Sequence, residues 1–205
     1  MDTLHILITG ASGGIGEATA LRLAQPSPRY TVKTLVLHYN SNASKTERIT
    51  REIGQVNPAI KVAWLQADLG SADEVDRLHR DAAAAAGAPI NVLFANAGTT
   101  GGHSGPTGTL DAVPPEVFEQ TWRVNTLSVY QLTQLVAPGM TAQNFGRVIY
   151  DSPVAGLTGG ALIEGTTMLP GGGAGDGELK AKIPVGRLGR PGEIAGVVCL
   201  MVENG

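Results

Sequence analysis

Short apolar runs alternate with amphipathic stretches along most of the chain. Each run is rich in β-branched residues, as buried strands are, and the stretch that follows most runs has the periodicity of a helix. The runs predict strands at residues 4–9, 34–38, 61–66, 91–95 and 147–150. Regular alternation of strand and helix is typical of parallel sheets that carry helices on both faces. The pattern therefore predicts an α/β fold with a doubly wound parallel sheet of five strands.

Helix start and stop signals separate the predicted strands. The first two helices are expected at residues 16–25 and from a Ser44 cap toward Asn57. Ser71, with Glu74 three residues later, predicts a capping box that opens a helix over residues 72–86. Further helices are expected at residues 116–136, after two prolines, and at residues 193–202.

Size, charge and cysteine content narrow the classes of protein. With 205 residues, the chain is expected to form a single domain over residues 1–205. The net charge of −3 and the lack of a basic block argue against a nucleic-acid partner and against a polybasic membrane patch. The single Cys199 and the four scattered histidines have no metal-ligand spacing, so no metal site is expected. The first apolar run follows Asp2 and is too short for a signal segment, which favours a cytoplasmic protein.

Glycine is about twice as frequent as in an average protein, with 28 residues in 205. One cluster of glycines lies between the first predicted strand and the first predicted helix. In such a turn Gly10 permits a tight bend, Gly14 lets the backbone approach phosphates, and Gly16 allows close helix packing. The N-terminus of the helix adds free N–H groups and the positive end of its dipole. The arrangement predicts a cradle for the pyrophosphate of a dinucleotide, whereas a glycine-rich turn alone is also a common structural feature.

Four motifs occur in the order seen in classical short-chain dehydrogenases/reductases. They are Thr9-Gly10-x3-Gly14-x-Gly16, Asp68-Leu69 after the third strand, Asn96-Ala97-Gly98 after the fourth, and Asn125 within Arg123-Val124-Asn125. Residues 183–195 also resemble the stretch before the last helix in the 3-oxoacyl-[acyl-carrier-protein] reductase branch of that family. The resemblance spans nearly the whole chain and implies a Rossmann-like domain that binds a nicotinamide dinucleotide.

The resemblance also implies roles for individual residues. The glycine turn, with Ser12 and Ile15, would contact the cofactor. Asp68 and Leu69 would lie beside the adenine, and Asn96, Ala97 and Gly98 beside the adenine ribose. Asn125 would belong to the catalytic tetrad. Three of these positions have plain structural alternatives, with Asp68 as a turn cap, Asn96 in an Asx turn and Asn125 as a buried helix residue. The joint occurrence of the motifs favours the functional interpretation.

The end of the second strand carries the signal for cofactor choice. An acidic residue there binds the 2′-hydroxyl of NAD and repels a 2′-phosphate. Here Asn40 and Ser41 follow the strand without an acid, and Lys45 lies close by in sequence, so NADP(H) is the favoured cofactor. Gly13 stands where the family usually has a basic residue, which keeps NAD as the alternative.

The catalytic groups of the family are incomplete in this sequence. The resemblance implies a Ser that binds the substrate oxygen, a Tyr that donates the proton, and a Lys four residues later that lowers the pKa of the Tyr. None of the four tyrosines has a Lys at that spacing, and Pro153 stands at the usual Ser position. Ser152 is a candidate if the backbone shifts by one residue, and its plainer interpretation is a turn begun with Pro153. Tyr150, on the same strand face as Ser152, is either a substitute acid or, more simply, a packing residue.

The part of the chain after Ser152 is shorter than in the family. Residues 154–160 resemble the loop after the family's fifth strand, and residues 161–168 resemble the loop after its sixth. A parallel crossover needs about a dozen residues, and residues 153–160 are too few for one. We therefore expect an intact cofactor half over residues 1–152 and a shortened substrate part over residues 153–205, without the family's last strand. Apolar residues there are expected to lose cover: Leu162, Ile163, Met168, Val197, Val198, Leu200 and Met201.

Two classes of function follow from these observations. The first is an NADP(H)-dependent oxidoreductase that reduces a 3-oxoacyl-like carbonyl, in a small molecule or an acyl thioester, to an alcohol. The second is a nucleotide-binding pseudoenzyme, or the product of defective splicing or gene prediction. A catalytic acid contributes about 10² to 10⁴ in rate, so its absence favours the second class for activity. The resemblance implies homo-oligomers formed through the elements that are lacking here, so a poorly soluble chain or a monomer–dimer mixture with low cooperativity is expected.

Overall fold

The computed structural model of the chain describes residues 2–102, 113–152 and 187–204. The expectations for Pro153, for the loops at residues 154–160 and 161–168, and for residues 183–186 lie outside the described residues. In the described part of the chain, no helix is long and apolar enough to cross a membrane.

Five parallel strands form the sheet of the described residues. They are β1 (Asp2–Ile8), β2 (Tyr30–Tyr39), β3 (Lys61–Gln66), β4 (Val92–Ala95) and β5 (Arg147–Tyr150). Their order is β3-β2-β1-β4-β5, and every neighbouring pair is parallel. The structure thus confirms the predicted Rossmann-like, doubly wound sheet. The winding direction changes between β1 and β4, and ligands of such folds bind outside the carboxyl ends of the strands at that point.

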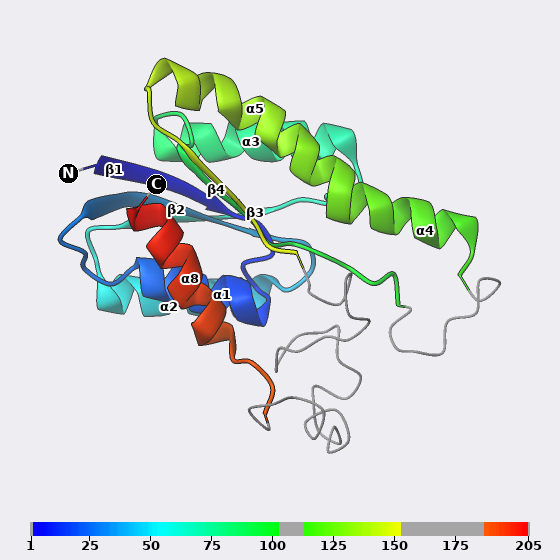
Figure 1. Cartoon of the computed structure of the whole chain (residues 1–205), viewed down its shortest axis with the longest axis horizontal. Helices are drawn as coiled ribbons and strands as arrows, with labels where there is room; N and C mark the ends of the chain where they lie inside the picture. Colours follow the sequence, from blue (N-terminus) through cyan, green and yellow to red (C-terminus); the bar gives the residue numbers. More distant parts are fainter. Residues whose placement is uncertain (1, 103–112, 153–186, 205) are drawn as a thin grey trace.

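Helices cover both faces of the sheet (Figure 1). One layer holds α1 (Gly14–Leu23), α2 (Ala43–Val56) and α8 (Pro191–Glu203). The other holds α3 (Ala72–Ala86) and α5 (Ser128–Ala142), and α4 (Pro115–Trp122) continues the line of α5 beyond the sheet. Since both faces are buried, the strands read as continuous apolar runs rather than as alternating ones.

Two hydrophobic cores lie on opposite faces of the sheet. Leu4, Ile6 and Ile8 of β1 belong to the core beneath α1, α2 and α8, where Val198 also packs. Leu7 of the same strand belongs to the core beneath α3 and α5. All four β1 side chains are fully buried. The alternation along β1 therefore fixes which side chains each helical layer covers.

The last helix covers α1 and leaves one of its own faces exposed. Val198, Cys199 and Val202 pack into the core, so the expected loss of cover at Val198 is wrong. Val197, Leu200 and Met201 are exposed by 48%, 57% and 49%, as expected. The helix thus buries a single stripe of side chains.

Several predicted boundaries and caps differ from the structure. Helix α1 begins at Gly14, two residues before the predicted start. Asn42 rather than Ser44 caps α2, because its side chain accepts a hydrogen bond from the N–H of Lys45 at 3.1 Å. Ser71 precedes α3 without a side-chain cap hydrogen bond, while Glu74 bonds Arg77, so the predicted capping box does not form.

The long helix predicted at residues 116–136 is also interrupted. A π-helical turn, η2 (Arg123–Leu127), separates α4 from α5. Apolar periodicity continues across this turn, so the sequence pattern does not reveal it. Single π-helical turns of this kind often lie at functional sites.

Two glycines offer opposite tests of local backbone conformation. Gly87 ends α3 with a φ of 67°, in the left-handed region, while Gly54 lies exposed within α2 with open space around its Cα. We expect Gly87→Ala to destabilise the fold by about 1 kcal/mol because of left-handed strain. Gly54→Ala should stabilise it by up to about 1 kcal/mol through helix propensity. Thermal melts should move in opposite directions by roughly 2–4 °C, and equal shifts of one sign would contradict the assignment.

Candidate functional site

A glycine-rich turn joins β1 to α1 at the carboxyl end of the sheet. Gly10 has a φ of 64°, a left-handed conformation that favours glycine. The N–H of Gly13 donates to the carbonyl of Gly10 at 2.9 Å, and α1 begins at the next residue. The N–H groups of Gly14, Ile15 and Gly16 have no acceptor among the described residues. They form the first turn of a helix, where N–H groups and the dipole favour an anion.

Close packing makes glycine necessary at two positions of this turn. A Cβ on Gly10 would lie 2.8 Å from the Cα of Ala97. A Cβ on Gly16 would lie 2.8 Å from the Cα of Ala11 and closer still to the carbonyl oxygen of Gly10. The turn, α1 and the loop after β4 therefore meet backbone to backbone, as the glycine spacing predicts.

Hydrogen bonds between Thr9 and Asn96 hold the turn against the loop after β4. The hydroxyl of Thr9, which is 1% exposed, accepts from the N–H groups of Asn96 and Ala97, each at 3.0 Å. The side-chain amide of Asn96 donates to the carbonyls of Thr9 at 2.8 Å and Gly10 at 3.1 Å. Asn96 is thus a cross-link between two strand ends rather than part of an Asx turn. Gly98 lies exposed just beyond this cross-link.

A buried histidine connects the ends of β1, β2 and β3. The Nδ1 of His38 accepts from the N–H of Gly10 at 3.1 Å, and its Nε2 lies 3.0 Å from the carbonyl oxygen of Ala67. The backbone carbonyl of His38 also accepts from the N–H of Ala11 at 2.8 Å. This pattern requires a neutral ring that carries its proton on Nε2. Burial lowers the pKa of His38 to about 4, in keeping with a neutral ring.

The segment after β2 presents polar groups to solvent. Asn40 and Ser41 are both exposed, and the structure places no acid between them and the start of α2. The Nζ of Lys45 lies 2.9 Å from a carboxylate oxygen of Glu17 in α1. Lys45 is therefore neutralised by a partner that the sequence pattern does not reveal.

Asp68 and Leu69 follow β3 and differ in burial. Asp68 is exposed, and its carboxylate accepts from the N–H of Gly70 at 2.8 Å. Leu69 is buried in the core beneath α3 and α5. Asp68 thus caps the turn, as its structural alternative predicts. Because its side chain is also exposed, a contact with an adenine is compatible with this capping role.

Asn125 lies in the π-helical turn and holds the loop after β4. Its side-chain oxygen accepts from the N–H of Thr99, and its side-chain nitrogen donates to the carbonyl of Thr99, both at 2.8 Å. Asn125 is exposed, so the alternative that it is a buried helix residue is wrong. The paired bonds connect Thr99, directly after the segment at residues 96–98, to the turn between α4 and α5.

Tyr150 and Ser152 lie at the carboxyl end of β5. Tyr150 is 55% exposed, and its hydroxyl lies 2.9 Å from that of Thr133 in α5. Tyr150 and Asn125 line one shallow cleft of about 240 Å³. Ser152 is exposed, and burial raises the pKa of the neighbouring Asp151. The structure therefore brings a phenol and an amide, two of the candidate groups, to one surface.

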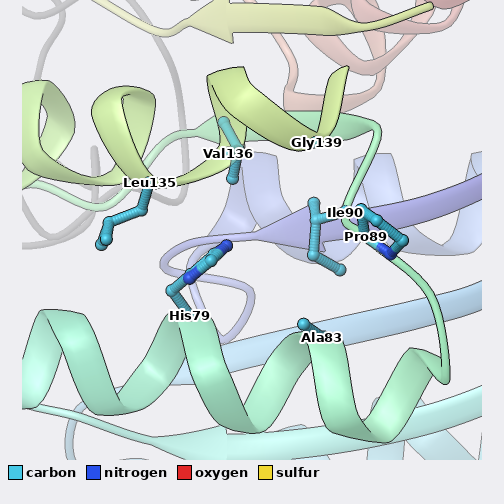
Figure 2. Close-up of a pocket in the computed structure, with 7 residues that line it drawn as sticks. All are labelled: His79, Ala83, Pro89, Ile90, Leu135, Val136 and Gly139. Atoms are coloured by element: carbon cyan, nitrogen blue, oxygen red, sulfur yellow. The ribbon is translucent and has the colours of Figure 1, made fainter. Parts of the chain in front are cut away.

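A second cavity of about 250 Å³ lies between α3 and α5 (Figure 2). Its lining is apolar apart from His79, and includes Pro89 and Ile90 just before β4. It is therefore at the amino end of β4, away from the glycine turn. With one polar side chain, it offers no set of converging groups for chemistry.

Four residues that support the site were not singled out for their roles by sequence reasoning. They are Glu17, His38, Thr99 and Thr9, the last of which was noted only as a member of the glycine motif. In the sequence, His38 stands out only as a polar residue at the end of an apolar run. Thr99 acts through its backbone, which no side-chain pattern reports.

Comparison with known proteins identifies the family. The profile of the short chain dehydrogenase family matches residues 4–164. The uncharacterized oxidoreductase YmfI of Bacillus subtilis is 27% identical, over 97% of this chain and 90% of that protein. A 3-oxoacyl-[acyl-carrier-protein] reductase of Synechocystis sp. is 34% identical, over 75% of this chain and 57% of that protein. For the uncharacterized oxidoreductase YusZ of Bacillus subtilis, the chain spans about half of the relative, 52%.

Solved structures share the fold. Levodione reductase superposes with a TM-score of 0.81 at 22% identity, over 98% of this chain and 90% of that one. An NAD⁺-bound xylitol dehydrogenase superposes with a TM-score of 0.77 at 20% identity, over 98% of this chain and 92% of that one. Together with the family profile, which covers most of the chain, these findings show that the chain belongs to the short-chain dehydrogenase family of oxidoreductases.

The buried His38 predicts a stability that falls in mild acid. Its pKa is about 4 in the folded state and about 6.5 when exposed, so the unfolded state binds the extra proton between these values. Stability is therefore complete above pH 6.5 and declines as the pH falls toward 4. We expect a loss of about 2 kcal/mol from this residue between pH 7 and 5, measured by urea unfolding. His38→Asn keeps an acceptor for Gly10 without titrating and should flatten this decline; equal slopes for both proteins would contradict the assignment.

Proposed function

We propose that this chain binds a nicotinamide dinucleotide, with preference for NADP(H), and that its family reaction is the reduction of a carbonyl to an alcohol. The observation that carries the proposal is the glycine turn, whose free N–H groups at Gly14, Ile15 and Gly16 begin α1 beside the sheet's change of winding direction. The cross-link from Thr9 to Asn96 fixes these groups before any ligand arrives.

The residues present fit such a cofactor. Gly10 and Gly16 leave no room for side chains, so the backbone itself forms the cradle, and Ser12 lies within the turn. In this proposal the pyrophosphate occupies the N-terminus of α1. The adenine lies beside Asp68 and Leu69, and its ribose lies beside Asn96, Ala97 and Gly98.

The preference for NADP(H) rests on the segment after β2. Asn40 and Ser41 are exposed amide and hydroxyl groups, and no carboxylate stands there to repel a 2′-phosphate. NAD is the alternative, because Gly13 supplies no cation and Lys45 is paired with Glu17. The single cysteine supports a reducing compartment such as the cytoplasm.

The proposed substrate is a 3-oxoacyl-like carbonyl in a small molecule or an acyl thioester. A relative of 34% identity is a 3-oxoacyl-[acyl-carrier-protein] reductase, which supports this class. When bound, the nicotinamide supplies the hydride. Asn125 holds the loop at Thr99, and Ser152 offers an exposed hydroxyl to orient a carbonyl oxygen.

The second candidate function is nucleotide binding without turnover. The observation that favours it is the absence of any Tyr with a Lys four residues later in the whole sequence. Asn125 has no ionisable proton to give. Tyr150 carries a phenol, but no Lys follows it at that spacing to assist proton donation.

The cradle predicts cofactor binding that a single carboxylate abolishes. We expect calorimetry to show tighter binding of NADPH than of NADH. Gly14→Asp should abolish binding of both, because its carboxylate would face the pyrophosphate at the start of α1. The control Gly54→Asp makes the same change on the exposed face of α2 and should bind as the wild type does. Binding that survives Gly14→Asp would show that the cradle lies elsewhere, and equal affinities would remove the argument from Asn40 and Ser41.

The missing acid predicts little turnover. We expect NADPH oxidation with a β-ketoacyl thioester to be about 10² to 10⁴ slower than in a version with a family-like crossover helix and strand, carrying Tyr-x3-Lys, inserted after Gly160. Comparable rates would refute the nucleotide-binding alternative. In that case Tyr150→Phe would show whether the exposed phenol has become the proton donor, since only a catalytic role makes the rate depend on its hydroxyl.

A further inference from the structure

We propose that Glu17 limits the preference for NADP(H) by holding the cations that would otherwise attract a 2′-phosphate. The inference rests on the proposed function and concerns four residues, Glu17, Lys45, Arg48 and Glu52, which we call the Glu17 cluster. Glu17 lies in the first turn of α1, directly after the glycine turn. The other three lie on α2.

The contacts of Glu17 engage both cations. One carboxylate oxygen lies 2.9 Å from the Nζ of Lys45, and the other lies 2.5 Å from a guanidinium nitrogen of Arg48. The side chain of Glu17 is 21% exposed, so solvent screens these pairs only partly. Burial alone raises the pKa of Glu17, but the hydrogen bonds from Arg48 and Lys45 outweigh it and lower the pKa below its ordinary value. Glu17 is therefore charged at neutral pH.

The position of Lys45 gives these contacts a consequence for cofactor choice. Lys45 is in the first turn of α2, and its N–H is capped by Asn42 at the end of the segment that begins with Asn40. In dinucleotide-binding folds this segment receives the 2′ substituent of the adenine ribose, and a nearby cation accommodates a 2′-phosphate. Lys45 is the cation nearest in sequence to this segment, and its partner is an acid on the cofactor-binding helix.

The charges of the cluster cancel. Glu17 and Glu52 offset Lys45 and Arg48, because Arg48 also pairs with Glu52 at 2.5 Å. A phosphate beside Asn40 would therefore meet a neutral cluster in which Glu17 holds Lys45. Removing the charge of Glu17 leaves a net positive charge beside this segment. Removing the charge of Glu52 gives the same net change but leaves the pair of Glu17 and Lys45 in place, because Glu52 contacts Arg48.

Glu17→Gln and Glu52→Gln therefore form a matched pair for calorimetry with NADPH and NADH. We expect Glu17→Gln to raise the ratio of NADPH to NADH affinity by about fivefold, by tightening NADPH alone. Glu52→Gln should change the ratio by less than about twofold, because Lys45 stays paired with Glu17 in this variant. The double variant Glu17→Gln with Lys45→Gln should return the ratio to near the wild-type value.

Each outcome bears on the proposal. An unchanged ratio in Glu17→Gln, equal tightening of NADH, or an equal effect of Glu52→Gln overturns it. Failure of the wild type to bind either cofactor overturns the proposed function itself, which separates the two. If Glu17→Gln shows no cooperative melt, Lys45→Gln alone provides the test. It leaves Glu17 less compensated and should lower the ratio, and an unchanged ratio then overturns the inference.

Discussion

The candidate site depends on the hydrogen bonds that hold the end of β1 to the end of β4. Thr9 is buried, and its hydroxyl accepts two backbone N–H groups from the loop after β4, while Asn96 returns two bonds to the carbonyls of Thr9 and Gly10. Buried backbone polar groups need hydrogen-bond partners, and this exchange supplies partners for N–H and carbonyl groups just beyond the ends of β1 and β4. The glycine turn is fixed as a result, directly before the first residue of α1.

His38 extends the same constraint to the other side of β1. Its ring connects Gly10 to Ala67, so the ends of β1, β2 and β3 share one polar network. The network contains a neutral imidazole because one ring nitrogen accepts while the other donates. The glycine turn is thus supported on both sides by hydrogen bonds made within the chain. Support of this kind keeps binding groups in position at little entropic cost on binding.

The sequence predicts the fold well and the supports of the site poorly. Apolar runs and glycine spacing locate every strand of the described sheet and the glycine turn, because burial and close backbone approach constrain residue type. The π-helical turn at Asn125, the pairing of Glu17 with Lys45 and the exposure of Tyr150 depend on which elements meet in space. Ser44 and Ser71 show the same limit, since cap residues are interchangeable in sequence and only geometry selects Asn42.

The residues proposed for cofactor binding and those proposed for proton transfer lie in different parts of the structure. The residues whose hydrogen bonds hold the glycine turn lie on β2 and in the loops that follow β1, β3 and β4: Thr9, Gly10, His38, Ala67, Asn96 and Ala97. Asn125 and Tyr150, by contrast, lie at the edge formed by η2, α5 and β5, where the phenol bonds only Thr133 among the contacts that the structure describes. A chain can therefore lose the acid of its family without disturbing the hydrogen bonds that prepare the cradle. The groups proposed to bind the cofactor are thus held by hydrogen bonds that do not involve Tyr150.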